Sequence, residues 1–114
     1  MSETVSDGEF IKAIQGIGDF DNEKERCEAA NDYLETKKYY SMELDEKVHF
    51  IDELIRIVEE SDDKDLKTGM RAISCTITKG RDIDEEERNK ARELCKAAGG
   101  SNEVAGFGIL RLVQ

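Results

Sequence analysis

The sequence lacks proline and tryptophan, and only 6% of its 114 residues are aromatic. It has no apolar run of bilayer length, which excludes a membrane-spanning helix. The first residues, Met1 to Val5, are acidic and lack the basic and apolar regions of a signal peptide. Few aromatics with 39% charged residues is a composition shared with disordered chains, but the 38% apolar residues recur at helical spacing. The length predicts one folded domain, residues 1–114, and the lack of signal-peptide features, together with the cysteine pattern, predicts a cytoplasmic location.

Cysteine is scarce as well. Cys27, Cys75 and Cys95 are odd in number, far apart in the sequence and without a Cys-x-x-Cys pair. This pattern favours reduced, mostly buried thiols in the cytosol over a disulfide framework or a cysteine zinc site.

Basic residues are fewer than acidic ones, 17 against 27, for a formal charge of −10. The charge is uneven, because residues through Lys64 carry 19 acids and 8 bases, whereas the remainder carries 8 acids and 9 bases. A direct nucleic-acid-binding surface is therefore not expected. Acidic side chains gathered on one face would attract a basic protein surface, and the alternative is that they only solvate exposed helix faces.

The segment from Leu44 to Glu60 has the clearest pattern. At 3.6 residues per turn its apolar residues cover an arc of about 180°, more than the ~100° needed to contact a core from one side. A helix of this kind packs against at least two neighbours. We predict an all-α bundle of about five helices around this central amphipathic helix, residues 44–60, with a C-terminal apolar segment.

Helix boundaries follow from capping patterns. Ser6-Asp7-Gly8-Glu9 has the spacing of a capping box for a first helix that ends at Gly16 and Gly18. Asn22 and Asp84 are expected caps of the second and fifth helices, with Glu87 completing the box of the fifth. The second helix is expected to reach about Tyr40. Three further signals are the Ser41 or Asp45 cap of the 44–60 helix, the Ser61-Asp62-Asp63 break that caps the fourth helix, and the Gly99-Gly100 stop.

The fourth segment also fits a strand, because Ile73, Cys75 and Ile77 alternate with polar residues. The alternative fold is therefore α+β, with strands near 72–78 and 106–113.

No arrangement of residues indicates catalysis, a cofactor or a metal. His49 is the only histidine and lies on the polar face of its helix, so a di-iron site, which needs a second histidine, is not expected. Carboxylates are abundant, but nothing distinguishes a catalytic pair from a solvated helix surface. We expect no enzyme activity and no bound cofactor.

Ile83-Asp84-Glu85-Glu86-Glu87 resembles the end of an Asp-Gly-x-Ile/Phe turn followed by an acidic helix start, and Asp7-Gly8-Glu9-Phe10 resembles its first half. Both are features of the TerB-like tellurite-resistance domains, which Met70 to Gly100 resembles as a helical hairpin. The resemblance implies an all-helical stress-response module that binds divalent metal through acidic turns. Lys79-Gly80-Arg81 stands where the family has Asp-Gly.

The preferred function is that of a non-catalytic protein that presents an acidic surface to a basic partner protein. Adaptors, immunity proteins and inhibitors that block a nucleic-acid-binding surface act in this way. The Tyr39-Tyr40 pair is either an interface anchor or one core tyrosine with its neighbour at the rim. The expected partner-binding residues are Tyr39, Tyr40, Glu46, Asp52, Glu53, Glu59 and Glu60.

Overall fold

The computed structural model describes residues 2–80 and 82–100, with side chains from residue 8 onward. This part of the chain holds five α-helices, a short 3₁₀-helix and no strand. The prediction of an all-α bundle is confirmed. The strand alternative at 72–78 is wrong, because these residues lie in a helix, and its second strand at 106–113 lies outside the described residues. The helices are α1 Ser2–Gly18, α2 Glu23–Thr36, η1 Tyr39–Ser41, α3 Leu44–Glu59, α4 Lys64–Thr78 and α5 Glu85–Ala97.

Three helix starts agree with the capping residues read from the sequence. The side chain of Asn22 accepts a hydrogen bond from the Glu25 amide, Asp63 accepts one from Leu66, and Asp84 accepts one from Glu86. Each carboxylate or amide oxygen satisfies a backbone donor that the first helical turn leaves free.

The capping residues of the other two helices differ from the prediction. α1 begins at Ser2, so Ser6-Asp7-Gly8-Glu9 lies within the helix and is not its cap. α3 is capped by Glu43 and not by Ser41 or Asp45, and a reciprocal capping box joins Glu43 to Glu46. A glutamate in the role usually filled by serine or threonine gave no recognisable signal in the sequence.

Helix ends follow backbone conformation. α2 ends at Thr36, earlier than the expected Tyr40, because Lys38 adopts the left-handed conformation with φ of 61°. The Gly99-Gly100 stop is confirmed: Gly99 has φ of 89°, and the Gly100 amide donates to the Cys95 carbonyl at 2.8 Å. This bond and the left-handed Gly99 end α5 in the manner common at glycine-terminated helices.

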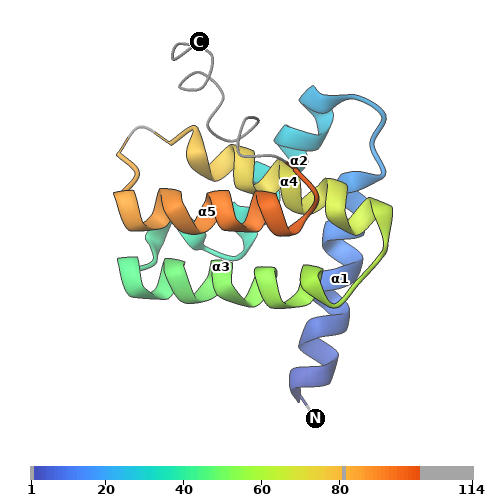
Figure 1. Ribbon diagram of the computed structural model, residues 1–114, viewed down its shortest axis with the longest axis horizontal. Helices are drawn as coiled ribbons and strands as arrows, with labels where there is room; N and C mark the ends of the chain where they lie inside the picture. The colour runs from blue at the N-terminus through green and yellow to red at the C-terminus, as the bar shows by residue number, and fades with distance from the viewer. Residues whose placement is uncertain (1, 81, 101–114) are drawn as a thin grey trace.

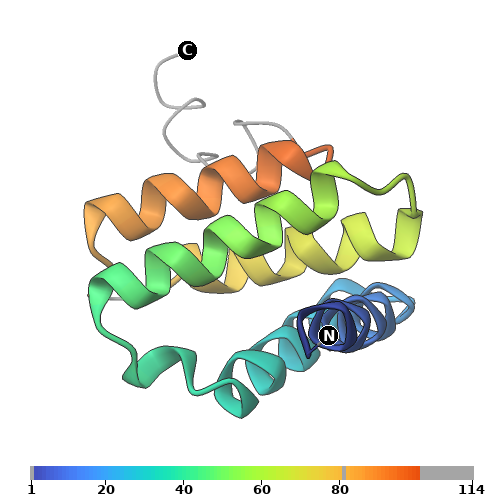
Figure 2. The same cartoon turned by 90° about the horizontal axis from the view of Figure 1, so that it is seen from below.

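The helix at the centre of the bundle is α4. It contacts each of the other four α-helices, and Figures 1 and 2 show it between α3 and α5 on one side and α1 and α2 on the other. α3 does pack against two neighbours, mainly α5 and to a lesser extent α4, as its wide apolar arc predicted. The expectation that the bundle is organised around α3 is corrected, because α3 lies at the outside of the assembly.

A close approach of two backbones explains why α4 holds this place. α1 crosses α4 steeply (Figure 1), and a Cβ atom at Gly69 would overlap the carbonyl oxygen of Ile14. A Cβ at Gly18 would likewise overlap the carbonyl oxygen of Asp65. The crossing therefore depends on two glycines, one on each helix.

All five helices contribute to one hydrophobic core. Its fully buried large side chains are Ile14, Leu34, Tyr39, Ile51, Leu54, Val58, Leu66, Met70, Ile73 and Leu94.

Candidate functional site

A groove of about 480 Å³ opens between α1 and the first three turns of α3. Phe10 comes from α1, and Met42 comes from the turn that follows η1. The remaining lining residues belong to α3 at helical spacing: Asp45, Glu46, His49, Phe50 and Glu53. The groove therefore joins the apolar edge of one helix to the acidic edge of another.

The floor of the groove is apolar. The rings of Phe10 and Phe50 meet edge to face with centroids 6.2 Å apart, a favourable geometry for aromatic pairs. Phe10 also meets Tyr33 edge to face at 6.3 Å, and the Lys37 ammonium lies 4.6 Å from the Phe10 centroid. Phe50 is buried and Phe10 half-buried, so a ligand in the groove would contact a floor fixed by the core.

The rim of the groove is acidic. Asp45 and Glu46 are exposed and Glu53 is half-buried. One oxygen of Glu46 accepts a hydrogen bond from the Glu43 amide at 3.0 Å, which fixes the carboxylate beside the groove. Glu53 lies 3.8 Å from His49 Nε2 and accepts from Arg56 at 3.0 Å. Fixed carboxylates around an apolar floor complement a ligand that is both basic and apolar.

The structure brings together only two of the acids predicted to bind a partner, Glu46 and Glu53. Asp52 lies on the side of α3 that faces α5, where it forms an ion pair of 2.8 Å with Lys90. Glu59 and Glu60 are exposed at the opposite end of α3, about 20 Å along the helix axis from Glu46.

The two tyrosines predicted as partner contacts have different environments. Tyr40 is 48% exposed and donates to Asn31 Oδ1 at 2.7 Å. Tyr39 is only 1% exposed, so the expectation of an exposed anchor at this position is corrected. Of the two readings of the pair, the structure has one core tyrosine with its neighbour at the surface.

The partner of Tyr39 is a buried carboxylate that was expected to lie in a helix cap. The Tyr39 hydroxyl donates to Glu87 Oε2 at 2.5 Å, and Lys47 Nζ lies 3.9 Å from the same oxygen. Glu87 was expected to complete a capping box, but it is only 6% exposed and points into the bundle. The signal for this was present, since Glu87 precedes Ala91 and Leu94 on the apolar stripe of α5.

Burial of Tyr39 raises the pKa of its phenol above the ordinary value, and the neighbouring Glu87 carboxylate raises it further. The phenol is therefore neutral at physiological pH and acts as a donor to the carboxylate. A cleft of about 200 Å³ reaches this pair from the loop before α5.

Within residues 2–80 and 82–100 no group of three or more histidine, cysteine, aspartate or glutamate side chains is arranged to hold a metal ion. Asp84, one of the aspartates in the TerB-like segment, is the cap of α5. The three cysteines are free thiols, Cys95 buried and the other two half-buried. No helix in the described part of the chain is both long and apolar enough to cross a bilayer.

Comparisons of the chain with protein-family models, with curated proteins and with solved structures gave no significant match. The resemblance to TerB-like domains stays a prediction, and so does the metal binding that it implies.

Proposed function

We propose that the protein is a non-catalytic docking protein that binds a basic amphipathic segment of a partner protein in the groove between α1 and α3. The observation that carries the proposal is the pairing of an aromatic floor, Phe10 and Phe50, with an acidic rim, Asp45, Glu46 and Glu53. An apolar groove beside a helix is a common receptor for an amphipathic helix, whose anchors recur every three or four residues.

Charge supports the same class of partner. The segment through Lys64 carries 19 of the 27 acids and includes α1 and α3, the two helices of the groove. Such a field would speed the encounter with a basic segment and repel nucleic acid and anionic lipid. The protein would act as an adaptor or as an inhibitor that covers the basic surface of its target.

The probe for this proposal is a fluorescein-labelled peptide with lysine and arginine on one helical face and leucine and phenylalanine on the other. We expect saturable binding by fluorescence anisotropy, weakened by about tenfold as salt rises from about 0.05 to about 0.5 M. A scrambled peptide of the same composition, whose apolar residues share no face, should bind more weakly. Salt-independent affinity, or equal affinity for both peptides, would refute the proposal.

Two matched double variants locate the site. E46Q/E53Q removes two charges at the groove, and the amide oxygen introduced at position 46 can still accept from the Glu43 backbone amide. E59Q/E60Q removes two charges from the other end of the same helix. We expect E46Q/E53Q to weaken peptide binding by about fivefold or more and E59Q/E60Q to change it less than about twofold. Equal losses would mean that the peptide reads net charge and not the groove.

A further inference from the structure

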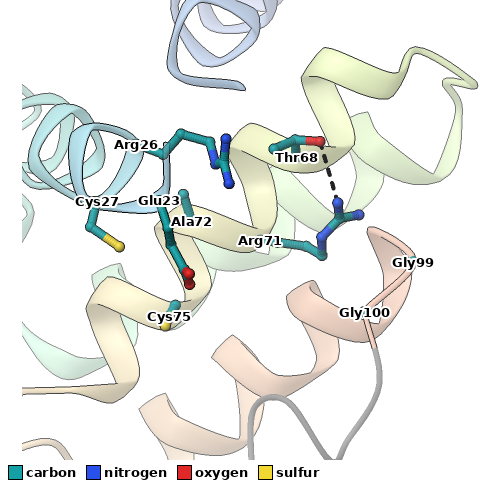
Figure 3. Close-up of a pocket in the computed structure, with 9 residues that line it drawn as sticks. All are labelled: Glu23, Arg26, Cys27, Thr68, Arg71, Ala72, Cys75, Gly99 and Gly100. Atoms are coloured by element: carbon teal, nitrogen blue, oxygen red, sulfur yellow. Dashed lines mark hydrogen bonds between the residues drawn. The ribbon is translucent and has the colours of Figure 1, made fainter. Parts of the chain in front are cut away.

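A second cavity, of about 380 Å³, lies between α2, α4 and the end of α5, and it shares no lining residue with the acidic groove. Figure 3 shows two arginines at one end of it, Arg26 from α2 and Arg71 from α4, with the hydroxyl of Thr68 beside them. A cavity of this size is within the range of small-molecule sites.

Both guanidinium groups are held by the backbone. Arg26 donates to the Phe20 carbonyl at 2.7 Å, and Arg71 donates to the Ala98 carbonyl at 2.7 Å and to Thr68 Oγ1 at 3.3 Å. A guanidinium has five N–H donors, so each arginine keeps several for a ligand. Fixed side chains also lose less conformational entropy when a ligand binds.

No carboxylate in the described part of the chain neutralises either of the two arginines. The chain has 27 acidic residues, yet within the described residues neither Arg26 nor Arg71 forms an ion pair with a carboxylate. Glu23 also lines the cavity, but Figure 3 shows its carboxylate toward the end that holds Cys27 and Cys75. Two positive charges therefore face one end of the cavity.

The opposite end is apolar apart from Glu23. Ala72 and the thiols of Cys27 and Cys75 form its wall. Burial raises the pKa of the Cys75 thiol, so this thiol is neutral at physiological pH. A ligand suited to both ends would have a dianionic group at one end and a small organic part, with a hydroxyl or amine donor for Glu23, at the other.

We propose that this cavity binds a small phosphate monoester, with the phosphate held by Arg26, Arg71 and Thr68 and the organic part against Ala72 and the two cysteines. A phosphate monoester carries about two negative charges at neutral pH. This charge matches the two guanidinium groups better than the single charge of a carboxylate ligand would. The site is independent of the peptide groove.

The test uses glycerol 3-phosphate as the probe, with inorganic phosphate and acetate for comparison, followed by heteronuclear NMR. We expect one saturable site for glycerol 3-phosphate, shifts of the Arg26, Thr68 and Arg71 resonances, weaker binding of inorganic phosphate and weaker still of acetate. Absence of saturable binding, acetate binding as tightly as the phosphates, or shifts confined to other residues would overturn the proposal.

Variants separate specific binding from general attraction. R26Q and T68V should each weaken glycerol 3-phosphate binding, R26Q by about tenfold or more. K24Q removes the same charge from an exposed position on α2 and should change affinity less than about twofold. Arg71 also donates to the end of α5, so its substitution could disturb the fold. R71K keeps the charge and a donor, and we expect it to bind the probe more tightly than R71Q does. A loss in K24Q equal to that in R26Q would contradict the site, whereas E46Q/E53Q should bind the probe normally.

Discussion

The hydroxyl of Tyr39 donates a hydrogen bond of 2.5 Å to the carboxylate of Glu87, and both side chains are buried. The bond spans 48 positions in the sequence and ties the 3₁₀-turn before α3 to the first turns of α5. Lys47 supports the pair from α3, with its ammonium 5.4 Å from the Tyr39 ring centroid. A buried carboxylate requires such partners, since an unpaired one would be costly to remove from water.

Y39F should lower the free energy of unfolding by about 2 kcal/mol, because it leaves the buried Glu87 carboxylate without its hydroxyl donor. Y40F, which removes the hydroxyl of an exposed neighbour, serves as the matched control and should cost less than about 0.5 kcal/mol. Urea unfolding followed by circular dichroism measures both. In a double-mutant cycle with E87Q the two residues should couple; equal effects of Y39F and Y40F would contradict the assignment.

Alkaline pH should unfold the protein through its buried tyrosines. Burial raises the pKa of Tyr33 and Tyr39 in the folded state above the value of about 10 expected in the unfolded chain. The folded protein then binds more protons than the unfolded one above pH ~10, so the free energy of unfolding is unaffected below that pH and falls as pH rises.

Absorbance in the near ultraviolet, where the phenolate absorbs, measured together with circular dichroism checks this expectation. Tyr40, which is half-exposed, should ionise in the folded protein, whereas Tyr33 and Tyr39 should ionise together with the loss of helical signal. Reversible ionisation of all three tyrosines near pH ~10 with the helical signal intact would disprove it.

The close crossing of α1 and α4 predicts opposite effects of the same substitution at different glycines. G69A and G18A should each destabilise the protein by about 3 kcal/mol or more, since the added methyl meets backbone atoms that have no rotamer by which to move aside. G16A, in the same helix as Gly18 but with open space around it, should stabilise by about 0.8 kcal/mol through helix propensity. Thermal and urea unfolding of the three variants gives the comparison, and a neutral G69A would exclude the close crossing.

The ion pair between Asp52 and Lys90 should matter little. The 2.8 Å contact with Asp52 raises the pKa of Lys90. The contribution of the ion pair to the free energy of unfolding is therefore present below the lysine pKa of the unfolded chain, and it is lost as pH rises through the lysine pKa of the folded protein. Both groups are partly exposed, and solvent screens the pair. D52N should change the free energy of unfolding at neutral pH by less than about 0.5 kcal/mol and leave peptide binding unchanged. A loss of peptide affinity in D52N would mean that Asp52 belongs to the binding surface.

Local patterns in the sequence were sufficient for the fold class. Helical spacing of apolar residues and the caps at Asn22, Asp63 and Asp84 are properties of neighbouring positions, and they predicted most helix boundaries. The wide apolar arc of α3 suggested a central helix, but α4 has that place because Gly69 admits the α1 backbone. The space beside a glycine is a tertiary property and leaves no periodic signal.

The groove was predicted in part. Glu46 and Glu53 were identified from charge and helix face, whereas the floor forms only when Phe10 of α1 meets Phe50 of α3, a residue far along the chain. The cavity with Arg26 and Arg71 was not predicted, because its two cations come from different helices in a chain whose overall charge is negative. Such sites form when separate helices pack together. A single sequence reveals a site of this kind only where all of its residues lie on one helix.

The contact between Gly18 and the α4 backbone has a kinetic consequence. The first helix leaves the ribosome well before the fourth, and its main packing partner lies some fifty residues downstream, so during early synthesis α1 can make only its smaller set of contacts with α2. Contacts between residues so distant in the chain slow folding. Until they form, the apolar surface of α1 remains exposed to solvent. During refolding, α1 should therefore complete its packing only once α4 has formed.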